Sequence, residues 1–594
     1  MVASLRHRGP DGNGVYVSGP IGLGHTRLAI VDLSETGKQP MTRNDVVMVY
    51  NGELYNSHVL RAELEALGHT FRGTSDSEVL LAAFIEWGTA VFRRLNGMYA
   101  AAFWDGRKLT LVRDRYGIKP LFIAKTANGL VFGSEPKAIL AAGRTERRLD
   151  YRALHEFLYY GTALGKLTLF DDIQCLLPGH AMEIDANGSR TLRYWDPAAL
   201  APQFIGVDGA IQGVRDRLDT AVRDHLMSDV PVGVFLSGGI DSSAIAVLAA
   251  KHYGGRLQTF TAGFDFAGAV DEMPQARALA SELGTEHHEL RVRGGDLASV
   301  IEKLVIAHDQ PFSDAANIPL YLLCEAVGSS VKVILQGDGG DEIFAGYRRY
   351  AQTSWSRSLR MLARGRRLIV GRGIQRDRAL KMLDAFALHD PALRIAAITT
   401  QERLRRPLEA LAVDARARVE ATDPFARFRE VVEPLRHLGP VQQHLYADAQ
   451  ILLPDVFLEK VDKPTMAHSV EIRVPMLDAN LAAYAMALPA GYKVHRNQKK
   501  WILRQALRGI VPDRILDAPK QGFGVPYPDW LRTSLRPWMQ EVLFDQSFAD
   551  WGVIDPHVLR STVDDHVSGR QNRGFFLYKM LNLALWKDRY NVQS

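Results

Sequence analysis

Length, composition and charge already exclude several classes of protein. The chain has 594 residues, of which 47% are hydrophobic and 23% are charged, which is ordinary for a soluble globular protein of more than one domain. Its 2 cysteines are too few for a disulfide framework, and no apolar run approaches the roughly 20 residues that span a bilayer. We therefore expect a cytoplasmic protein with no membrane partner.

The net charge of +5 is small for this length, and part of the basic excess is local. Arginines crowd residues 357–378 without interleaved aromatic residues or a nucleic-acid motif. This pattern indicates a solvated helical face or a connector, and we expect no nucleic-acid partner.

The first part of the chain, residues 1–197, predicts an α+β domain dominated by antiparallel sheet. Apolar periodicity predicts strands over Gly24–Leu33, Val46–Gly52, Tyr99–Trp104, Leu109–Arg113, Leu121–Lys125 and Leu130–Gly133, and helices over Ser57–Leu67 and Ser77–Leu95. Asp105-Gly106 and Asn128-Gly129 lie between neighbouring strands and are typical of hairpin turns.

After a joint containing proline and glycine at residues 197–209, the pattern changes to alternating strands and helices. Strands are expected over Pro231–Leu236, Leu257–Gly263, His287–Arg291 and Val331–Gln336, and helices over Ala210–Met227, Asp241–Tyr253, Leu297–His308 and Ile318–Val327. This alternation predicts a doubly wound parallel sheet in a domain over residues 210–594, with a mostly helical part from about Tyr350. Its ligand should lie beyond the carboxyl ends of the strands.

The most informative segment is the loop in Val232–Ser243, which reads VGVFLSGGIDSS. Adjacent glycines let backbone N–H groups approach an anion, and the following helix adds partial positive charge at its N-terminus. Ser237, Ser242 and Ser243 supply hydroxyl donors, while Asp241 can hold magnesium on the same phosphates. The Gly-Lys-Ser/Thr ending of a Walker A loop is missing. The segment resembles the SGGxDS loop of the ATP pyrophosphatase superfamily, which implies cleavage of ATP between its α and β phosphates.

A second strand ends in the acidic, glycine-rich sequence GDGGDE at residues 337–342. Its carboxylates can complete the metal site that Asp241 begins, with magnesium held between Asp241 and Asp341. The overlapping sequence GGDEIF nearly matches the signature motif of diguanylate cyclases. In those enzymes the signature caps a hairpin, whereas here a buried strand precedes it, so we reject that reading.

Two further segments carry charged residues. Taken alone, residues 459–478 predict a helix end with surface ion pairs among Lys463, Glu471 and Arg473. Their sequence is EKVDKPTMAHSVEIRVPMLD. Residues 519–526, PKQGFGVP, predict a lid loop whose Lys520 could meet phosphate or carboxylate charge.

In this order, the four segments resemble the synthetase domain of glutamine-hydrolysing asparagine synthetases of the B type. The resemblance implies ATP contacts from Leu236, Ser237, Gly238, Gly239, Asp241, Ser242, Ser243, Gln336 and Gly337. It also implies that Asp241 and Asp341 are metal ligands and that Asp338 and Lys520 are catalytic residues. Contacts to aspartate are implied for Lys463, Glu471 and Arg473. Two positions depart from the family: Gln336 stands where several members have serine, and Asp338 where others have glutamate.

The N-terminal part carries that family's glutaminase motifs, namely RHRGPDG, HTRLAIVDL, YNGELYN, SDSE and RDRYGIKPLF. Arg27 offers a fork for a substrate carboxylate, Asp76 a counter-charge for an ammonium group, and Asn51 and Gly52 donors for an oxyanion. The resemblance implies an Ntn-hydrolase-like antiparallel sandwich that binds glutamine through Arg27, Leu28, Ile30, Asn51, Gly52, Glu53 and Asp76.

The family's nucleophile, an N-terminal cysteine, is missing from this sequence, which begins Met-Val-Ala. Cys175 is expected in a buried strand and Cys324 in a helical core, and neither has a free amine beside it. Two explanations stay open. Either the true chain begins one strand earlier, or the protein uses free ammonia.

The resemblance implies ATP- and magnesium-dependent amidation of aspartate through β-aspartyl-AMP, with glutamine or ammonia as the nitrogen source and a homodimer as the candidate oligomer. Two alternatives remain. The first is a ligase for another carboxylate, including a β-lactam-forming relative. The second is a non-catalytic regulatory protein that binds ATP or glutamine.

Overall fold

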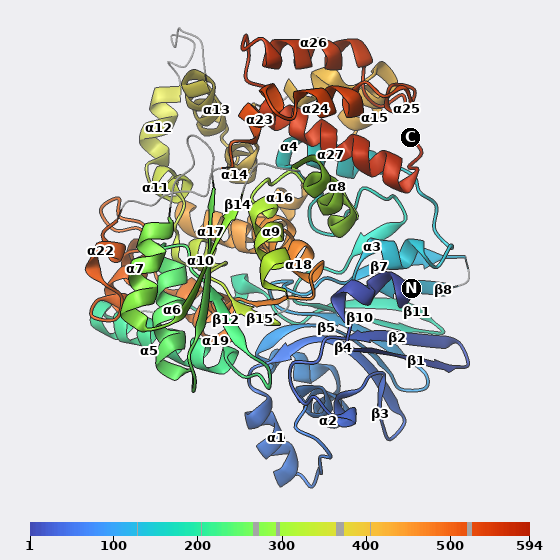
Figure 1. The fold of residues 1–594 in the computed structure, drawn as a ribbon, viewed down its shortest axis with the longest axis vertical. Coiled ribbons are helices and arrows are strands. Elements are labelled where there is room, and N and C mark those ends of the chain that lie inside the picture. The colour runs from blue at the N-terminus through green and yellow to red at the C-terminus, as the bar shows by residue number, and fades with distance from the viewer. Residues whose placement is uncertain are drawn as a thin grey trace.

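The computed structural model describes residues 1–127, 129–202, 205–264, 272–292, 297–328, 330–363, 374–403, 406–518 and 525–594. In Figure 1 the N-terminal strands lie at the lower right, the parallel sheet with its helices at the left, and the C-terminal helices across the top. Residues 364–373 of the arginine-rich segment and the predicted lid lysine Lys520 fall outside the described residues.

The N-terminal part is built from antiparallel strands. They are β1 (Gly12–Ser18), β2 (Ile21–Arg27), β3 (Met41–Arg43), β4 (Val46–Leu54), β5 (Gly97–Trp104), β6 (Leu109–Arg113), β7 (Phe122–Thr126), β8 (Gly129–Gly133), β9 (Ile173–Cys175), β10 (His180–Asp185) and β11 (Gly188–Arg193). A six-stranded sheet has the order β11-β10-β6-β5-β4-β3, beside the β1-β2 hairpin and the sheet β8-β7-β9. The helices here are α1 (Ser57–Ala66), α2 (Asp76–Trp87), α3 (Pro136–Leu140) and α4 (Tyr151–Tyr160).

Strand β4 explains why these strands form a sandwich. Successive side chains of a strand point to opposite faces, and both faces of β4 are apolar. Met48 and Tyr50 pack in the core beneath α2, whereas Val47 and Val49 pack in a second core shared with Ile123 of β7. The predicted α+β sandwich is therefore confirmed.

Two predicted elements of this part have different bounds. The strand expected over Gly24–Leu33 is β2, which ends at Arg27, because the chain then turns away and buries Ile30 in the core of the following domain. The helix expected over Ser77–Leu95 ends at Trp87, where Gly88 has φ +55°, and a 3₁₀ turn continues to Arg93.

The second part holds a parallel sheet of order β14-β13-β12-β15-β16. Its elements are α5 (Val207–His225), β12 (Val232–Phe235), α6 (Ile240–His252), β13 (Gln258–Phe264), α7 (Met273–Leu283), β14 (Glu286–Val292), α8 (Leu297–His308), α9 (Asn317–Val327), β15 (Val333–Leu335) and β16 (Glu471–Arg473). Figure 1 shows α5, α6 and α7 on one side of the sheet and α9 on the other, which confirms the doubly wound arrangement.

Strand β16 is the strand of this parallel sheet that the sequence did not predict. Its three residues pair in parallel with β15 and are all buried. The expectation of surface ion pairs is therefore wrong for Lys463, Glu471 and Arg473, which are 1%, 6% and 0% exposed. Such a short strand with charged residues at both ends has no apolar pattern from which it could be recognised.

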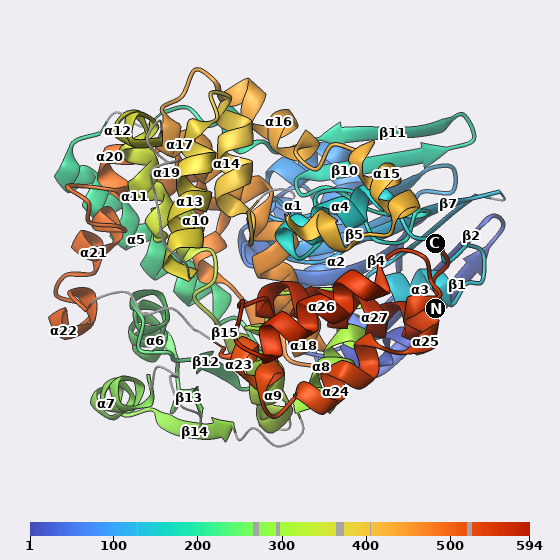
Figure 2. The same cartoon turned by 90° about the horizontal axis from the view of Figure 1, so that it is seen from above.

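The remaining helices cover the sheet and the N-terminal domain (Figure 2). They are α10 (Gly340–Phe344), α11 (Arg348–Ser354), α12 (Ser356–Ala363), α13 (Ile374–Ala387), α14 (Pro391–Thr399), α15 (Val413–Glu420), α16 (Ala426–Val432), α17 (Pro440–Gln450), α18 (Glu459–Met466), α19 (Ala479–Ala487), α20 (Ala490–Lys493), α21 (Trp501–Leu507), α22 (Asp513–Leu516), α23 (Tyr527–Arg532), α24 (Arg536–Leu543), α25 (Gln546–Ala549), α26 (Pro556–Val567) and α27 (Gly574–Tyr590). One core joins Phe157 of α4 to Tyr578 of α27, so the C-terminal helix packs on the N-terminal domain. Among the described helices, none combines the length and the apolar character that crossing a membrane requires.

Candidate active site

The loop after β12 is folded as a cradle at the N-terminus of α6. The hydroxyls of Ser237 and Ser242 lie 2.9 Å apart, and the Ser242 hydroxyl donates to the Gly239 carbonyl at 3.2 Å. Gly238 has φ +68°, a conformation that favours glycine. An anion placed here would meet the free N–H groups and positive dipole end of α6.

The loop after β15 lies directly against this cradle. A Cβ atom added to Gly337 would lie 2.7 Å from the Cβ of Asp241, and one added to Gly340 would lie 2.8 Å from the Asp241 carboxyl carbon. Glycine is therefore needed at both positions for the second loop to approach Asp241. The structure brings together the two segments that the sequence predicts to hold ATP.

Asp241 and Asp341 converge on one cation, the ammonium group of Lys500. The Lys500 Nζ is 2.6 Å from the Asp341 Oδ1 and also contacts the Asp241 Oδ2. Sequence reasoning missed Lys500, which stands 259 positions after Asp241 and immediately before α21, in a segment that carries no motif.

The two aspartates also fit a magnesium ion, since carboxylate oxygens are the ligands that magnesium prefers. Within the described ranges, no group of three His, Cys, Asp or Glu side chains is placed to hold a metal. A magnesium ion held by these two aspartates would take its remaining ligands from water or from a substrate such as a nucleotide phosphate.

Asp338 lies at the same loop and faces α18. Its Oδ1 is 3.6 Å from the Lys460 Nζ, and the two side chains are 15% and 17% exposed. Burial raises the pKa of Asp338, and the charge of Lys460 opposes that rise. The other predicted catalytic residue, Lys520, lies outside the described residues.

The three predicted aspartate-binding residues lie at the interface with the N-terminal domain. The Lys463 Nζ is 3.9 Å from Glu135, the Glu471 Oε2 is 3.4 Å from the Lys119 Nζ, and the Arg473 Nη2 is 3.2 Å from Glu53. None of these contacts involves the loop that carries Asp241. Their role in aspartate binding stays a prediction.

The N-terminal domain contains a pocket of about 120 Å³. The seven predicted glutamine-binding residues all line it: Arg27, Leu28, Ile30, Asn51, Gly52, Glu53 and Asp76. The structure thus gathers side chains that are up to about 50 positions apart in sequence into one cavity, although their role in glutamine binding stays a prediction.

Polar groups in this pocket are arranged to receive a charged ligand. Asp76 accepts hydrogen bonds from the Tyr50 hydroxyl and the Leu54 N–H, both at 2.9 Å, and burial raises its pKa. The Asn51 side-chain amide is buried and has no hydrogen-bond partner among the described residues. An unpaired buried donor is costly, so a ligand oxygen at this point would be favoured.

Arg27 is already engaged by the chain itself. Its Nη1 donates to the Ser34 carbonyl at 2.8 Å, and its Nη2 contacts the Asp32 carbonyl. Neutral carbonyls leave the charge of the guanidinium uncompensated, so the group can still attract a carboxylate. Burial lowers the pKa of the neighbouring His25 to about 4, so this imidazole is neutral near pH 7.

A larger cavity of about 560 Å³ adjoins the pocket and shares His25, Tyr50 and Asn51 with it. Apolar side chains such as Val49 and Phe132 line most of it. Among the described residues, no cysteine lines either cavity. The expectation that the true chain begins one strand earlier stays a prediction.

The two cysteines lie elsewhere. Cys324 in α9 is fully buried, as expected. Cys175 ends strand β9 but is only half-buried, and its Sγ lies 2.9 Å from the Arg113 Nη1.

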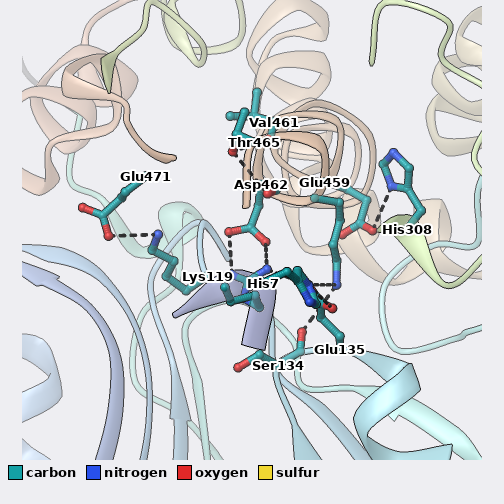
Figure 3. A network of polar contacts seen from close by, with 12 residues as sticks. His7, Lys119, Ser134, Glu135, His308, Glu459, Val461, Asp462, Thr465 and Glu471 are labelled. Atoms are coloured by element: carbon teal, nitrogen blue, oxygen red, sulfur yellow. Dashed lines mark hydrogen bonds and ion pairs between the residues drawn. The ribbon is translucent and has the colours of Figure 1, made fainter. Parts of the chain in front are cut away.

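A buried charge network ties the 120 Å³ pocket of the N-terminal domain to α18 (Figure 3). Arg8, which lines the pocket, donates to both carboxylate oxygens of Asp462 at 2.7 and 3.0 Å and to Glu135 at 2.9 Å. His7 binds the other Glu135 oxygen at 2.9 Å. Helix α18 therefore carries Lys460 towards the Asp338 loop and Asp462 towards the N-terminal domain.

Comparisons with known proteins agree with this two-part arrangement. The "Asparagine synthase" family model matches residues 213–588, and the "Glutamine amidotransferase domain" model matches residues 1–195. The chain is 31% identical to "Asparagine synthetase (glutamine-hydrolyzing) 1" of Bacillus subtilis over 99% of this chain and 92% of the relative. It is 34% identical to a "Putative asparagine synthetase (glutamine-hydrolyzing)" of Mycobacterium bovis over 98% and 92% of the two chains. It is also 29% identical to "Amidase chyE" of Penicillium rubens over 94% and 89%.

Proposed function

Because the chain belongs to the asparagine synthase family, with a glutamine amidotransferase domain ahead of the synthase domain, we propose that it converts aspartate to asparagine at the expense of ATP. One observation carries the proposal: the loops after β12 and β15 meet so closely that Asp241 and Asp341 share one cation. In this proposal, residues 210–594 carry out the ligase reaction and residues 1–197 bind glutamine.

In the first step the β-carboxylate of aspartate attacks the α-phosphate of ATP and releases pyrophosphate, which leaves β-aspartyl-AMP. The serine hydroxyls and N–H groups of residues 236–243, with Gln336 and Gly337 opposite, would orient the phosphates. Magnesium held by Asp241 and Asp341 would neutralise the departing pyrophosphate.

In the second step ammonia attacks the activated carbonyl and displaces AMP. Asp338 lies just before α10, which carries the proposed metal ligand Asp341, and its raised pKa suits a group that exchanges a proton with the incoming nitrogen. Lys520 is proposed to stabilise charge in the transition state. Lys463, Glu471 and Arg473 remain proposed contacts for aspartate, although their partners in the structure belong largely to the domain interface.

The nitrogen would come from glutamine or from free ammonia. In the glutamine pocket, Arg27 would bind the α-carboxylate, Asp76 the α-ammonium group, and Asn51 and Gly52 the oxyanion. No cysteine among the described residues lines this pocket, and both nitrogen sources stay open in the proposal. A homodimer, a cytoplasmic location and the absence of nucleic-acid partners complete the proposal as expectations.

The first prediction tests the ligase site by exchange of labelled pyrophosphate into ATP. We expect exchange that depends on both aspartate and magnesium, and a loss of about 100-fold or more in Asp241→Asn, as is typical when a group that stabilises the transition state is removed. Asp219→Asn is the matched control, because Asp219 pairs with Lys251 at 2.8 Å on the surface of α5.

Exchange without any stimulation by aspartate would overturn the asparagine assignment. Stimulation by a different carboxylic acid would favour a ligase for that acid instead. Absence of exchange with every acid would favour a regulatory protein that binds nucleotide without reacting it.

A further inference from the structure

The Lys500 side chain occupies the point at which the two predicted metal ligands meet. Its Nζ contacts Asp241 and lies 2.6 Å from Asp341, and the side chain is only 7% exposed. The two carboxylates come from different loops, and each is 20% exposed. A divalent cation bound to the same oxygens would need the space that the ammonium group holds.

The backbone is arranged specifically to deliver this side chain. Lys500 has φ +53° and ψ +31°, the left-handed conformation, which is strained for a residue other than glycine. A Cβ atom on Gly346 would lie 2.4 Å from the Lys500 Cε and would also overlap the Asp341 carboxylate. A glycine on the loop that carries Asp341 thus leaves room for the lysine to reach its partners.

Electrostatics explain why a cation is required there. Two carboxylates directed at one point repel each other when the local dielectric constant is low. The Lys500 ammonium group lies within ion-pair distance of both carboxylates. It therefore offsets one of the two negative charges without any bound metal.

We propose that Lys500 is a positioning residue that takes the place of the divalent cation between Asp241 and Asp341, so that metal binds tightly only together with a nucleotide. Metal alone must displace the ammonium group and leave it without a partner. Metal that arrives with a triphosphate brings phosphate oxygens that can accept the released ammonium group. The inference deepens the proposed function, on which its identification of the metal ligands rests.

The second prediction is tested by measuring Mn²⁺ binding in the absence of nucleotide. The electron paramagnetic resonance signal of the free ion reports how much Mn²⁺ is bound. We expect Lys500→Met to bind Mn²⁺ about tenfold or more tightly than the unaltered chain, because the bound metal no longer has to displace the lysine ammonium group. Lys500→Arg should bind as weakly as the unaltered chain. Lys251→Met, which removes a surface lysine, should change nothing.

Equal Mn²⁺ affinity of Lys500→Met and the unaltered chain would overturn the proposal. The double variant Lys500→Met/Asp341→Asn should lose the affinity that Lys500→Met gains. If the double variant keeps that affinity, the proposal is also contradicted. Lys500→Gln, with thermal unfolding measured with and without Mn²⁺, provides a second test if Lys500→Met does not fold. These measurements use no aspartate and no turnover, so failure of the proposed reaction would appear separately, in pyrophosphate exchange.

Discussion

Two clusters of buried charge in this molecule differ in how firmly each charge is held. At the domain interface, Arg8, Glu135 and Asp462 are at most 8% exposed, and each contacts at least two charged or polar partners. At the nucleotide loops, one lysine faces two aspartates that are each 20% exposed.

The difference indicates that buried ion pairs have two roles in this molecule, one at the domain interface and one at a candidate ligand site. The interface cluster is buried between the two domains, and its ion pairs join residues of one domain to residues of the other. The Lys500 cluster lies at the ends of two strands, where ligands of parallel sheets bind, so its cation can be replaced. Mutations that remove one charge from each kind of site should therefore have very different effects.

The third prediction has the largest expected effect on stability and concerns Arg8→Met. Without the guanidinium, the buried Asp462 loses its main partner and Glu135 loses one of several, and removing one member of a buried pair typically costs about 3–5 kcal/mol. The measurement is unfolding by urea. The double variant Arg8→Met/Asp462→Leu should recover part of the loss, since it removes the unpaired charge.

The pH dependence of the same variant gives an independent check. Burial alone would raise the pKa of Asp462, but the charge and hydrogen bonds of Arg8 outweigh burial and hold it below its ordinary value of 3.8. A carboxyl with a lowered pKa stabilises the fold above pH 3.8 and loses that contribution as the pH falls further. Arg8→Met should lose less stability in this acid range than the unaltered chain, and an equal loss would contradict the role given to Arg8.

The fourth prediction concerns Lys460→Met, where the expected effect is intermediate. Lys460 and Asp338 are 3.6 Å apart and largely buried, so Asp338 would be left without its cation and its pKa would rise further. We expect a loss of about 1–3 kcal/mol in urea unfolding, the usual penalty for one buried unsatisfied group. Lys460→Arg should retain most of the stability, and the same loss in both variants would show that packing, rather than charge, is responsible.

The fifth prediction has the smallest expected effect. Lys332 and Asp11 form a 2.8 Å ion pair that also joins the two domains, but the side chains are 36% and 29% exposed. Exposed pairs are worth about 0–1 kcal/mol and weaken with salt. Lys332→Met should therefore lower the free energy of unfolding by less than about 1 kcal/mol, measured with urea. A loss as large as that of Arg8→Met would show that burial does not explain why the two ion pairs differ in strength.

The sequence predicted most of what depends on local pattern. The antiparallel sandwich, the alternating strands and helices, and the loops after β12 and β15 each have an apolar run or a glycine-rich motif that identifies them. Gathering Asp241 and Asp341 at one point could also be predicted, because carboxyl ends of parallel strands lie at the same edge of a sheet.

What the sequence could not predict depends on contacts between distant segments. Lys500 meets Asp241 across 259 positions and belongs to no motif. Glu471 and Arg473 looked like surface residues because their partners, Lys119 and Glu53, are supplied by the other domain. Charged side chains are usually exposed, so their burial in a three-residue strand cannot be predicted without knowledge of their tertiary partners.

The outermost strands of the parallel sheet have a consequence for solubility. Unpaired strand edges can recruit strands from other molecules and so begin aggregation. One edge, β16, is buried against the N-terminal domain, while the opposite edge, β14, carries Glu286, His288, Glu289 and Arg291 along its exposed surface. Charge therefore protects one margin of the sheet, and the neighbouring domain shields the other from intermolecular pairing.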